Sequence, residues 1–209
     1  MKHTRIVFDV GAHIGEGIDW YLGHGFSHVV AIEPLPSALE ELHHKYDGNE
    51  RVIIVPKAVS DAVGKVVLHY GFNTSLSTIE THWMQGRFKG FSWPNSIGVE
   101  ATTLDLLIAE FGIPDLIKVD VEGHELFVFA GLSTPVEYIT FEYVGEFIDD
   151  SLEVVEVIAE LGSYEFCLYL GENARMVIDY LPFSKFVEEL RKWTGDNYGM
   201  IHARLKEKS

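Results

Sequence analysis

The chain has 209 residues, of which 47% are hydrophobic, and its 32 acidic and 16 basic residues give a formal net charge of −16. This length and apolar content suffice for one sizeable core, which predicts a single domain over residues 1–209. The acidic balance argues against a nucleic-acid partner, because proteins that bind nucleic acids usually show a basic face.

No apolar run approaches the ~20 residues that span a bilayer, so no membrane partner is expected. The first predicted strand begins near Met1, so no signal peptide is expected. The one cysteine, Cys167, cannot form an internal disulfide, which favours a reducing compartment. We therefore predict a cytoplasmic location.

Strand-like and helix-like segments alternate along the chain. Short apolar runs predict strands at residues 5–9, 28–33, 51–57, 65–70, 116–120, 137–142, 164–170 and 200–206. Helical periodicity predicts helices at residues 17–25, 37–46, 103–111, 122–130, 149–161 and 184–193, with Gly131 and Gly195 as C-caps of the fourth and sixth. This alternation predicts an α/β fold, doubly wound around a mostly parallel sheet, with an antiparallel C-terminal strand pair.

A glycine-spaced turn follows the first predicted strand, with Gly11 and Gly15 at its two ends. A dinucleotide-binding turn needs a second glycine two residues after the first, where the backbone approaches the pyrophosphate, and this chain has His13 there. Asp9 places a carboxylate at the strand end, where it would repel a pyrophosphate but suits the ammonium and sulfonium groups of S-adenosylmethionine. The turn therefore predicts a methyl-donor site.

A second acidic residue, Glu33, ends the strand predicted at residues 28–33 and precedes Pro34. An acidic residue about 20 positions beyond the glycine turn is the group expected to accept hydrogen bonds from ribose hydroxyls. Such a charge-assisted bond contributes ~1.5–3 kcal/mol. We expect Glu33 to lie at an exposed strand end and to determine cofactor affinity.

Five sequence blocks occur together in the order and spacing of FkbM-type methyltransferases, at residues 8–15, 31–36, 58–61, 103–105 and 118–125. The chain resembles this family over residues 6–131. The resemblance implies a class I, Rossmann-like, S-adenosylmethionine-dependent methyltransferase fold. It also implies O-methylation of sugars or polyketide-type metabolites.

The same resemblance implies a set of cofactor-binding residues by position. Asp9, Gly11 and Gly15 would surround the methionine part, Glu33 would bind the ribose, and Ala58, Val59 and Ser60 would line the adenine. Pro34, which follows Glu33, is also expected to contact the cofactor. His13 stands where the family usually has Asn. It can still donate a hydrogen bond, but a protonated ring would repel the sulfonium.

The catalytic residues are expected where the strand predicted at residues 116–120 ends. Sites in open α/β sheets form at the carboxyl ends of strands, so Asp120 is expected to point into the crevice. Methyl transfer to a hydroxyl requires loss of its proton, for which His124 is our first candidate base, with Asp120 as orienter or alternative base. Glu142 ends the next strand and is expected to face the same crevice. Asp120, Glu142 and Asp149 offer oxygen ligands for Mg²⁺, but no compact ligand motif supports a metal and none is predicted.

Residues 72–96 hold many aromatic side chains without a clean periodicity. Long irregular segments in compact domains are often functional, and aromatic platforms suit sugar rings or flat metabolites. We predict a lid over the acceptor pocket; a hydrophobic plug over the sheet is the alternative.

The predicted function is S-adenosylmethionine-dependent O-methylation of a small metabolite or glycan. Two alternatives stay open: a dinucleotide-dependent oxidoreductase, and a non-catalytic methyltransferase-like binding subunit. A nucleic-acid methyltransferase is disfavoured by the charge and by the lack of an Asn/Asp-Pro-Pro-aromatic motif. The sequence leaves the acceptor and the oligomeric state open.

Overall fold

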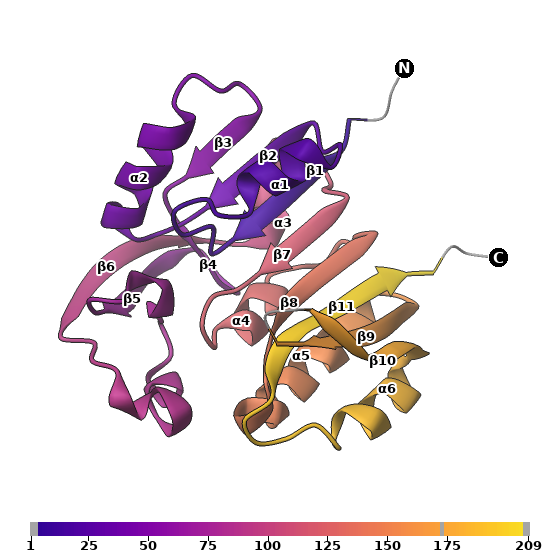
Figure 1. Cartoon of the computed structure of the whole chain (residues 1–209). Coiled ribbons are helices and arrows are strands. Elements are labelled where there is room, and N and C mark those ends of the chain that lie inside the picture. The colour runs from indigo at the N-terminus through magenta and orange to yellow at the C-terminus, as the bar shows by residue number, and fades with distance from the viewer. Residues whose placement is uncertain (1–3, 172–173, 207–209) are drawn as a thin grey trace.

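The computed structural model describes residues 4–171 and 174–206, apart from the side chains of residues 86 and 87 (Figure 1). Its main sheet has eight strands in the order β10-β9-β11-β8-β7-β1-β2-β3. Their bounds are β1 (Ile6–Val10), β2 (His28–Ile32), β3 (Val52–Val55), β7 (Leu116–Val119), β8 (Tyr138–Val144), β9 (Tyr164–Leu170), β10 (Arg175–Pro182) and β11 (Tyr198–Leu205).

The five strands from β3 to β8 in this order pair in parallel, whereas β11 runs antiparallel to both β8 and β9. The predicted α/β fold, its mostly parallel sheet and its antiparallel C-terminal pair are thus confirmed. Strand β10 adds a further antiparallel edge to β9 and was not predicted. Its only buried hydrophobic residue is Ile178, so it lacks the apolar alternation that reveals a strand in a sequence.

Helices pack on both faces of the sheet (Figure 1). One face carries α1 (Ile18–Gly23) and α2 (Pro36–Tyr46), and the other carries α3 (Leu104–Phe111), α4 (Glu125–Ala130), α5 (Ile148–Leu161) and α6 (Phe183–Leu190). Successive residues of a strand face opposite sides. Accordingly, Val7 packs with residues of α1 and α2, and Phe8 packs with residues of the other layer.

All six predicted helices are present, and Gly131 is the C-cap of α4 as expected. The expectation for Gly195 is wrong. Helix α6 ends at Leu190 with Arg191 as its C-cap, and Gly195 lies in the loop beyond it with a φ of 72°.

A second sheet lies beside the main one, with the strand order β4 (Ala58–Val59), β6 (Asn95–Thr102) and β5 (Gly64–Tyr70). The strand predicted at residues 65–70 belongs to this small sheet. Strand β6 was missed because its first half is largely exposed and gives no apolar alternation. Between β5 and β6 lie residues 71–94, which we call the β5–β6 segment.

The β5–β6 segment contains three short 3₁₀ turns, η1 (Thr74–Leu76), η2 (Thr81–Met84) and η3 (Gly86–Gly90). The indole of Trp93 donates a 2.7 Å hydrogen bond to the carbonyl oxygen of Leu76, which ties its two ends together. Among the described helices, none combines the length and apolar character that crossing a membrane requires.

Candidate active site

Three neighbouring cavities meet beyond the carboxyl ends of β1 and β7. The Glu33 cavity, of about 50 Å³, is lined by residues that include Gly11, His13, Glu33, Pro34, Ala58, Val59, Thr74, Asp120 and Glu122. The Lys118 cavity, of about 180 Å³, is lined by residues that include Asp9, Gly11, His13, Lys118, Asp120 and Glu122. The Tyr198 cavity, of about 290 Å³, is lined by Leu76, Phe88, Phe91, Glu122, Glu142, Val144 and Tyr198.

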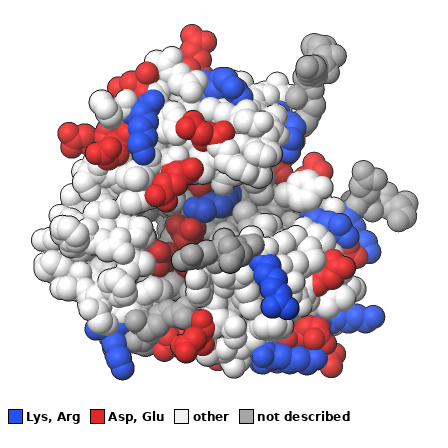
Figure 2. Space-filling view, in the orientation of Figure 1, with Lys and Arg blue, Asp and Glu red and all other residues white. Residues whose placement is uncertain are grey.

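Glu122 lines all three cavities, and Asp120 lines the first two. The face drawn in Figure 2 is hollowed at its centre, and acidic side chains gather in and beside the hollow. Most charged residues that line these three cavities are carboxylates.

The turn after β1 lies directly against the end of β7. A Cβ at Gly11, whose φ is 76°, would come within 1.9 Å of the carbonyl oxygen of Asp120, so only glycine fits there. His13 has a φ of 48°, in the left-handed region that Asn, Asp and His adopt more readily than other side chains do. Its Nε2 is hydrogen-bonded to Oγ1 of Thr74 at 2.9 Å. Burial lowers the pKa of His13, which favours a neutral ring near pH 7.

Glu33 is buried, with 6% of its surface exposed, which corrects the expectation of an exposed strand end. Its Oε2 accepts a 2.9 Å hydrogen bond from the backbone N–H of His13, and its Oε1 accepts one of 2.7 Å from Leu35. Burial raises the pKa of this carboxyl group despite these two bonds. A carboxylate can accept about four hydrogen bonds, so Glu33 can still receive donors from a ligand in its cavity.

Two residues predicted to bind the cofactor line none of these three cavities. Gly15 packs against α2, where a Cβ would lie 2.8 Å from side-chain atoms of Leu42 and Tyr46. The hydroxyl of Ser60 lies 3.0 Å from Nε2 of His124. Both residues shape the surroundings of the site from outside it.

Lys118 is a site residue that the sequence reasoning missed. Its Nζ lies 3.4 Å from Oδ1 of Asp9 and 3.4 Å from Oδ2 of Asp120, and it donates to the carbonyl oxygen of Gly11. Burial alone would lower the pKa of Lys118, but the carboxylates of Asp120 and Asp9 hold it above its ordinary value. A lysine within the otherwise apolar strand Leu116–Val119 was the available signal.

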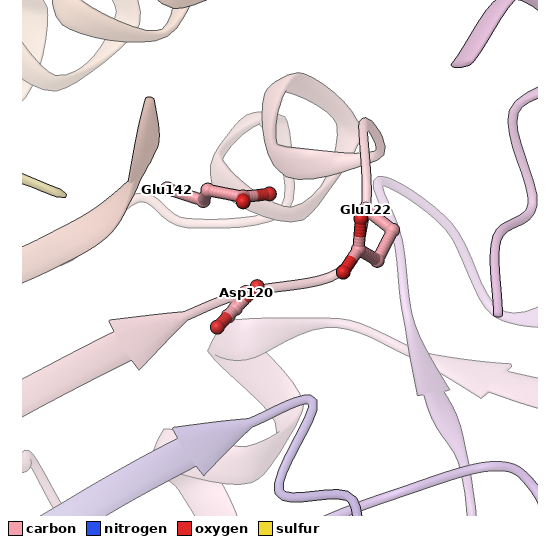
Figure 3. A group of neighbouring side chains, drawn as sticks. All are labelled: Asp120, Glu122 and Glu142. Carbon is pink, nitrogen blue, oxygen red and sulfur yellow. The ribbon is translucent and has the colours of Figure 1, made fainter. Parts of the chain in front are cut away.

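Asp120, Glu122 and Glu142 form an acidic cluster, in which one carboxylate oxygen from each residue lies within 4.8 Å of the others (Figure 3). Burial and the charge of Asp120 raise the pKa of Glu122 to about 8 and that of Glu142 well above its usual range. The sequence placed Asp120 and Glu142 together but gave Glu122 no role in the site. Its φ of 55° is unusual for a residue other than glycine, and such strained backbone often occurs at functional sites.

His124 is buried at the start of α4 and lines none of the three cavities. Its Nδ1 donates a 2.7 Å hydrogen bond to Oε1 of Glu80, and its Nε2 is bonded to Ser60. Both ring nitrogens are therefore engaged with the protein.

The β5–β6 segment covers the site. Trp83 is 3% exposed and stacks between Phe88 and Phe147, with ring centroids 5.2 and 4.7 Å away. Its Nε1 donates a 2.8 Å hydrogen bond to Oε2 of Glu122. Trp83 is thus packed into the protein, whereas Phe88 and Phe91 line the Tyr198 cavity. The lid and its alternative, a hydrophobic plug, both stay predictions.

A model of the methyltransferase FkbM domain matches residues 9–195 of this sequence. The chain belongs to the FkbM methyltransferase family. No curated protein matches the sequence.

Solved structures show the same fold. A methyltransferase FkbM from Methylobacillus flagellatus superposes with a TM-score of 0.57 at 17% identity, over 96% of this chain and 43% of that one. A ribosomal protein L11 methylase from Lactobacillus delbrueckii subsp. bulgaricus gives 0.50 at 12% identity, over 99% of this chain and 73% of that one. This FkbM chain thus has the class I methyltransferase architecture. It spans less than half the length of the Methylobacillus flagellatus protein.

Proposed function

We propose that this protein is an S-adenosylmethionine-dependent O-methyltransferase that acts on a hydroxyl group of a small metabolite or glycan in the cytoplasm. The observation that carries the proposal is the meeting of the three cavities at Glu122, beside Asp120. The Glu33 and Lys118 cavities offer charged and apolar groups for an S-adenosyl cofactor. The Tyr198 cavity, with the aromatic side chains of Phe88, Phe91 and Tyr198, would hold the acceptor.

The residues present fit this cofactor. Glu33 has lone pairs left to accept ribose hydroxyls, and Ala58 and Val59 offer an apolar wall for the adenine. In the Lys118 cavity, Lys118 and Asp9 offer opposite charges for the carboxylate and ammonium of the methionine part. When bound, S-adenosylmethionine would supply an electrophilic methyl group.

Entry of an adenosine group requires movement of the β5–β6 segment. The Glu33 cavity of about 50 Å³ is smaller than such a ligand, and residues 74–79 form part of its wall. The hydrogen bond between His13 and Thr74 joins this wall to the glycine turn and is one of the contacts that opening would break.

In the proposed reaction a bond forms between the methyl carbon and the acceptor oxygen, and the carbon–sulfur bond breaks. The hydroxyl proton must go to a group of the protein or to water. An acceptor in the Tyr198 cavity would contact Glu122 and Glu142, so we assign proton acceptance to the acidic cluster. His124, with both nitrogens engaged, acts in this proposal as a positioning residue that connects Glu80 to Ser60.

The oxidoreductase alternative has weaker support. Pyrophosphate binding needs a glycine that lets the phosphates reach the backbone. His13 stands at that position, and its ring is fixed to Thr74 beside the Glu33 cavity.

Calorimetry with S-adenosylhomocysteine and with NAD tests the cofactor, and a screen of hydroxylated sugars and metabolites with a labelled methyl donor tests the reaction. We expect S-adenosylhomocysteine to bind and NAD not to bind. In Glu142→Gln, cofactor binding should persist while turnover falls by ~10²–10⁴-fold, the usual effect of losing acid–base catalysis. Tighter binding of NAD would identify a dinucleotide enzyme. Cofactor binding without transfer to any acceptor would support the non-catalytic subunit instead.

A further inference from the structure

The acidic cluster lacks the positive charge that its three carboxylates require. Lys118 contacts Asp120, but it is shared with Asp9. Among the described residues no Lys or Arg forms an ion pair with Glu122 or Glu142. The three residues are partly buried, and like charges this close repel one another, so a bound cation would stabilise the ionised cluster.

Glu142 provides a second, separate observation. Its Oε2 is buried and has no hydrogen-bond partner among the residues that the structure describes. The side chain extends from β8 with its carboxylate toward Glu122 (Figure 3). A buried, unpaired carboxylate oxygen is costly, and such groups in native proteins are normally hydrogen-bonded or coordinate a metal.

From this geometry we propose that Asp120, Glu122 and Glu142 bind a divalent cation, Mg²⁺ or Mn²⁺. Carboxylate oxygens are the ligands that these hard cations prefer. The three residues come from the end of β7, the turn before α4, and β8, so the site forms only in the folded protein. Trp83 contributes by donating to Oε2 of Glu122, which orients this carboxylate.

The cation would face the Tyr198 cavity, where Glu122 and Glu142 form part of the wall. Three carboxylates leave coordination positions for water or for oxygen atoms of a ligand, since Mg²⁺ prefers six ligands. If the proposed methyl transfer holds, on which this step rests, the acceptor is a compound with two adjacent oxygen atoms that can both bind the cation, such as a vicinal diol. Metal coordination would lower the pKa of the hydroxyl to be methylated, and its proton would pass to water or to a free carboxylate oxygen.

Terbium luminescence offers a direct test, because Trp83 is hydrogen-bonded to one proposed ligand and can transfer excitation energy to a bound Tb³⁺. The purified full chain is first treated with a chelator and then titrated with Tb³⁺ under tryptophan excitation. Calorimetry with Mn²⁺ and Mg²⁺ measures binding independently. We expect saturable emission that Mg²⁺ and Mn²⁺ reduce by competition, and loss of most of it in Trp83→Phe while Mn²⁺ still binds.

Glu142→Gln is the decisive variant, with Glu153→Gln on the exposed surface of α5 as the matched control. Glu142→Gln should weaken Mn²⁺ binding at least about tenfold, because even residues outside the coordination shell contribute this much. Glu153→Gln should bind as the wild type does. In chelator, Glu142→Gln should melt at the same temperature as the wild type or higher, which shows that it folds.

Absence of calorimetric binding at millimolar Mg²⁺ and Mn²⁺, or equal affinity of Glu142→Gln and wild type, would overturn the metal site. Emission that persists in Trp83→Phe would place the bound ion elsewhere and would also overturn it. Because these measurements need neither methyl donor nor acceptor, their failure is distinct from failure of the proposed function. Conversely, a metal site in a protein that does not bind S-adenosylhomocysteine would leave this inference standing.

Discussion

The indole nitrogen of Trp83 donates a 2.8 Å hydrogen bond to Oε2 of Glu122, and this bond joins residues 39 positions apart in the sequence. It connects the β5–β6 segment to the turn that follows β7. The β5–β6 segment, which forms part of the wall of the Tyr198 cavity, is therefore tied to the acidic cluster, and a substitution in one should alter the other.

Replacing Trp83 with phenylalanine keeps most of the aromatic packing but removes this donor. A buried carboxylate oxygen left without its partner costs about 1–3 kcal/mol, so Trp83→Phe should lower the free energy of unfolding by this order. Trp20→Phe is the control, since Trp20 is 56% exposed on α1 and should lose little. Urea unfolding of both variants measures the difference; equal losses would mean that the bond to Glu122 contributes nothing.

Gly123 lies so close to Trp83 that an added Cβ would come within 2.7 Å of the indole. Its φ of 98° already disfavours any other residue. Gly123→Ala should therefore combine backbone strain with a clash, and Gly48→Ala isolates the strain, because Gly48 has a φ of 83° with no atom near its Cβ position. Strain alone costs on the order of 1–3 kcal/mol. We expect a distinctly larger loss of stability, together with a raised acceptor KM, in Gly123→Ala than in Gly48→Ala.

Glu33→Gln should weaken binding of S-adenosylhomocysteine by ~1.5–3 kcal/mol, or roughly tenfold to hundredfold, because hydrogen bonds to a charged acceptor are lost. The variant should also be less stable. The carboxylate accepts hydrogen bonds from the backbone N–H groups of His13 and Leu35 with its two oxygens, whereas an amide has only one oxygen that can accept. Calorimetry and thermal melting separate the two effects, with the exposed Glu41→Gln as control. Unchanged affinity in a folded Glu33→Gln would exclude Glu33 from the cofactor site.

The pair His124 and Glu80 should behave as a structural couple. A double-mutant cycle with His124→Ala, Glu80→Ala and both together should give a coupling energy of about 0.5–3 kcal/mol in unfolding experiments, as for residues in one hydrogen-bond network. If His124 only positions Glu80, each single variant should change turnover by a similar factor. A far greater loss of turnover in His124→Ala than in Glu80→Ala would restore His124 as the general base.

Glu125 predicts a pH dependence of stability. Burial raises its pKa to about 7, although its two oxygens accept hydrogen bonds from the backbone N–H groups of Val121 and Gly123. The folded state therefore binds a proton more tightly than the unfolded state, whose pKa is about 4.5. This contribution to stability is complete below pH 4.5 and is lost as the pH rises to 7, by on the order of 3 kcal/mol.

The side chain of Glu125→Gln cannot titrate, so this variant should lack the part of the pH dependence of stability that Glu125 causes. Urea midpoints measured at pH 5, 6, 7 and 8 should show the variant gaining stability relative to the wild type as the pH rises. A constant difference across this range would contradict the raised pKa.

Much of the fold could be read from local signals. The strands β1, β2, β7 and β8 are short apolar runs, and the six helices have clear periodicity or caps, so their existence and order were predictable. Strand β6, in the middle of the small sheet, and strand β10, at one edge of the main sheet, were not predicted. The first half of β6 and most of β10 are exposed, and such residues give no apolar alternation.

For the site, the sequence determined which carboxylates lie at or near strand ends. Asp120 follows β7, and Glu142 lies in β8, which pairs with β7 in the parallel sheet and continues to Val144 rather than ending at Glu142 as expected. The sequence also determined the glycine turn, since Gly11 must lie against the end of β7. These features follow from the local chain and from the rule that carboxyl ends of parallel strands share one edge.

Only the tertiary structure decided the environment of each group. It buried Glu33, engaged both nitrogens of His124, and brought Lys118 between two carboxylates. It also placed Trp83 over Gly123 and left one oxygen of Glu142 without a hydrogen-bond partner in the part of the chain that the structure describes. Burial, charge neighbours and hydrogen-bond partners arise from residues distant in the chain, and these contacts, rather than residue type, set the chemistry of a side chain.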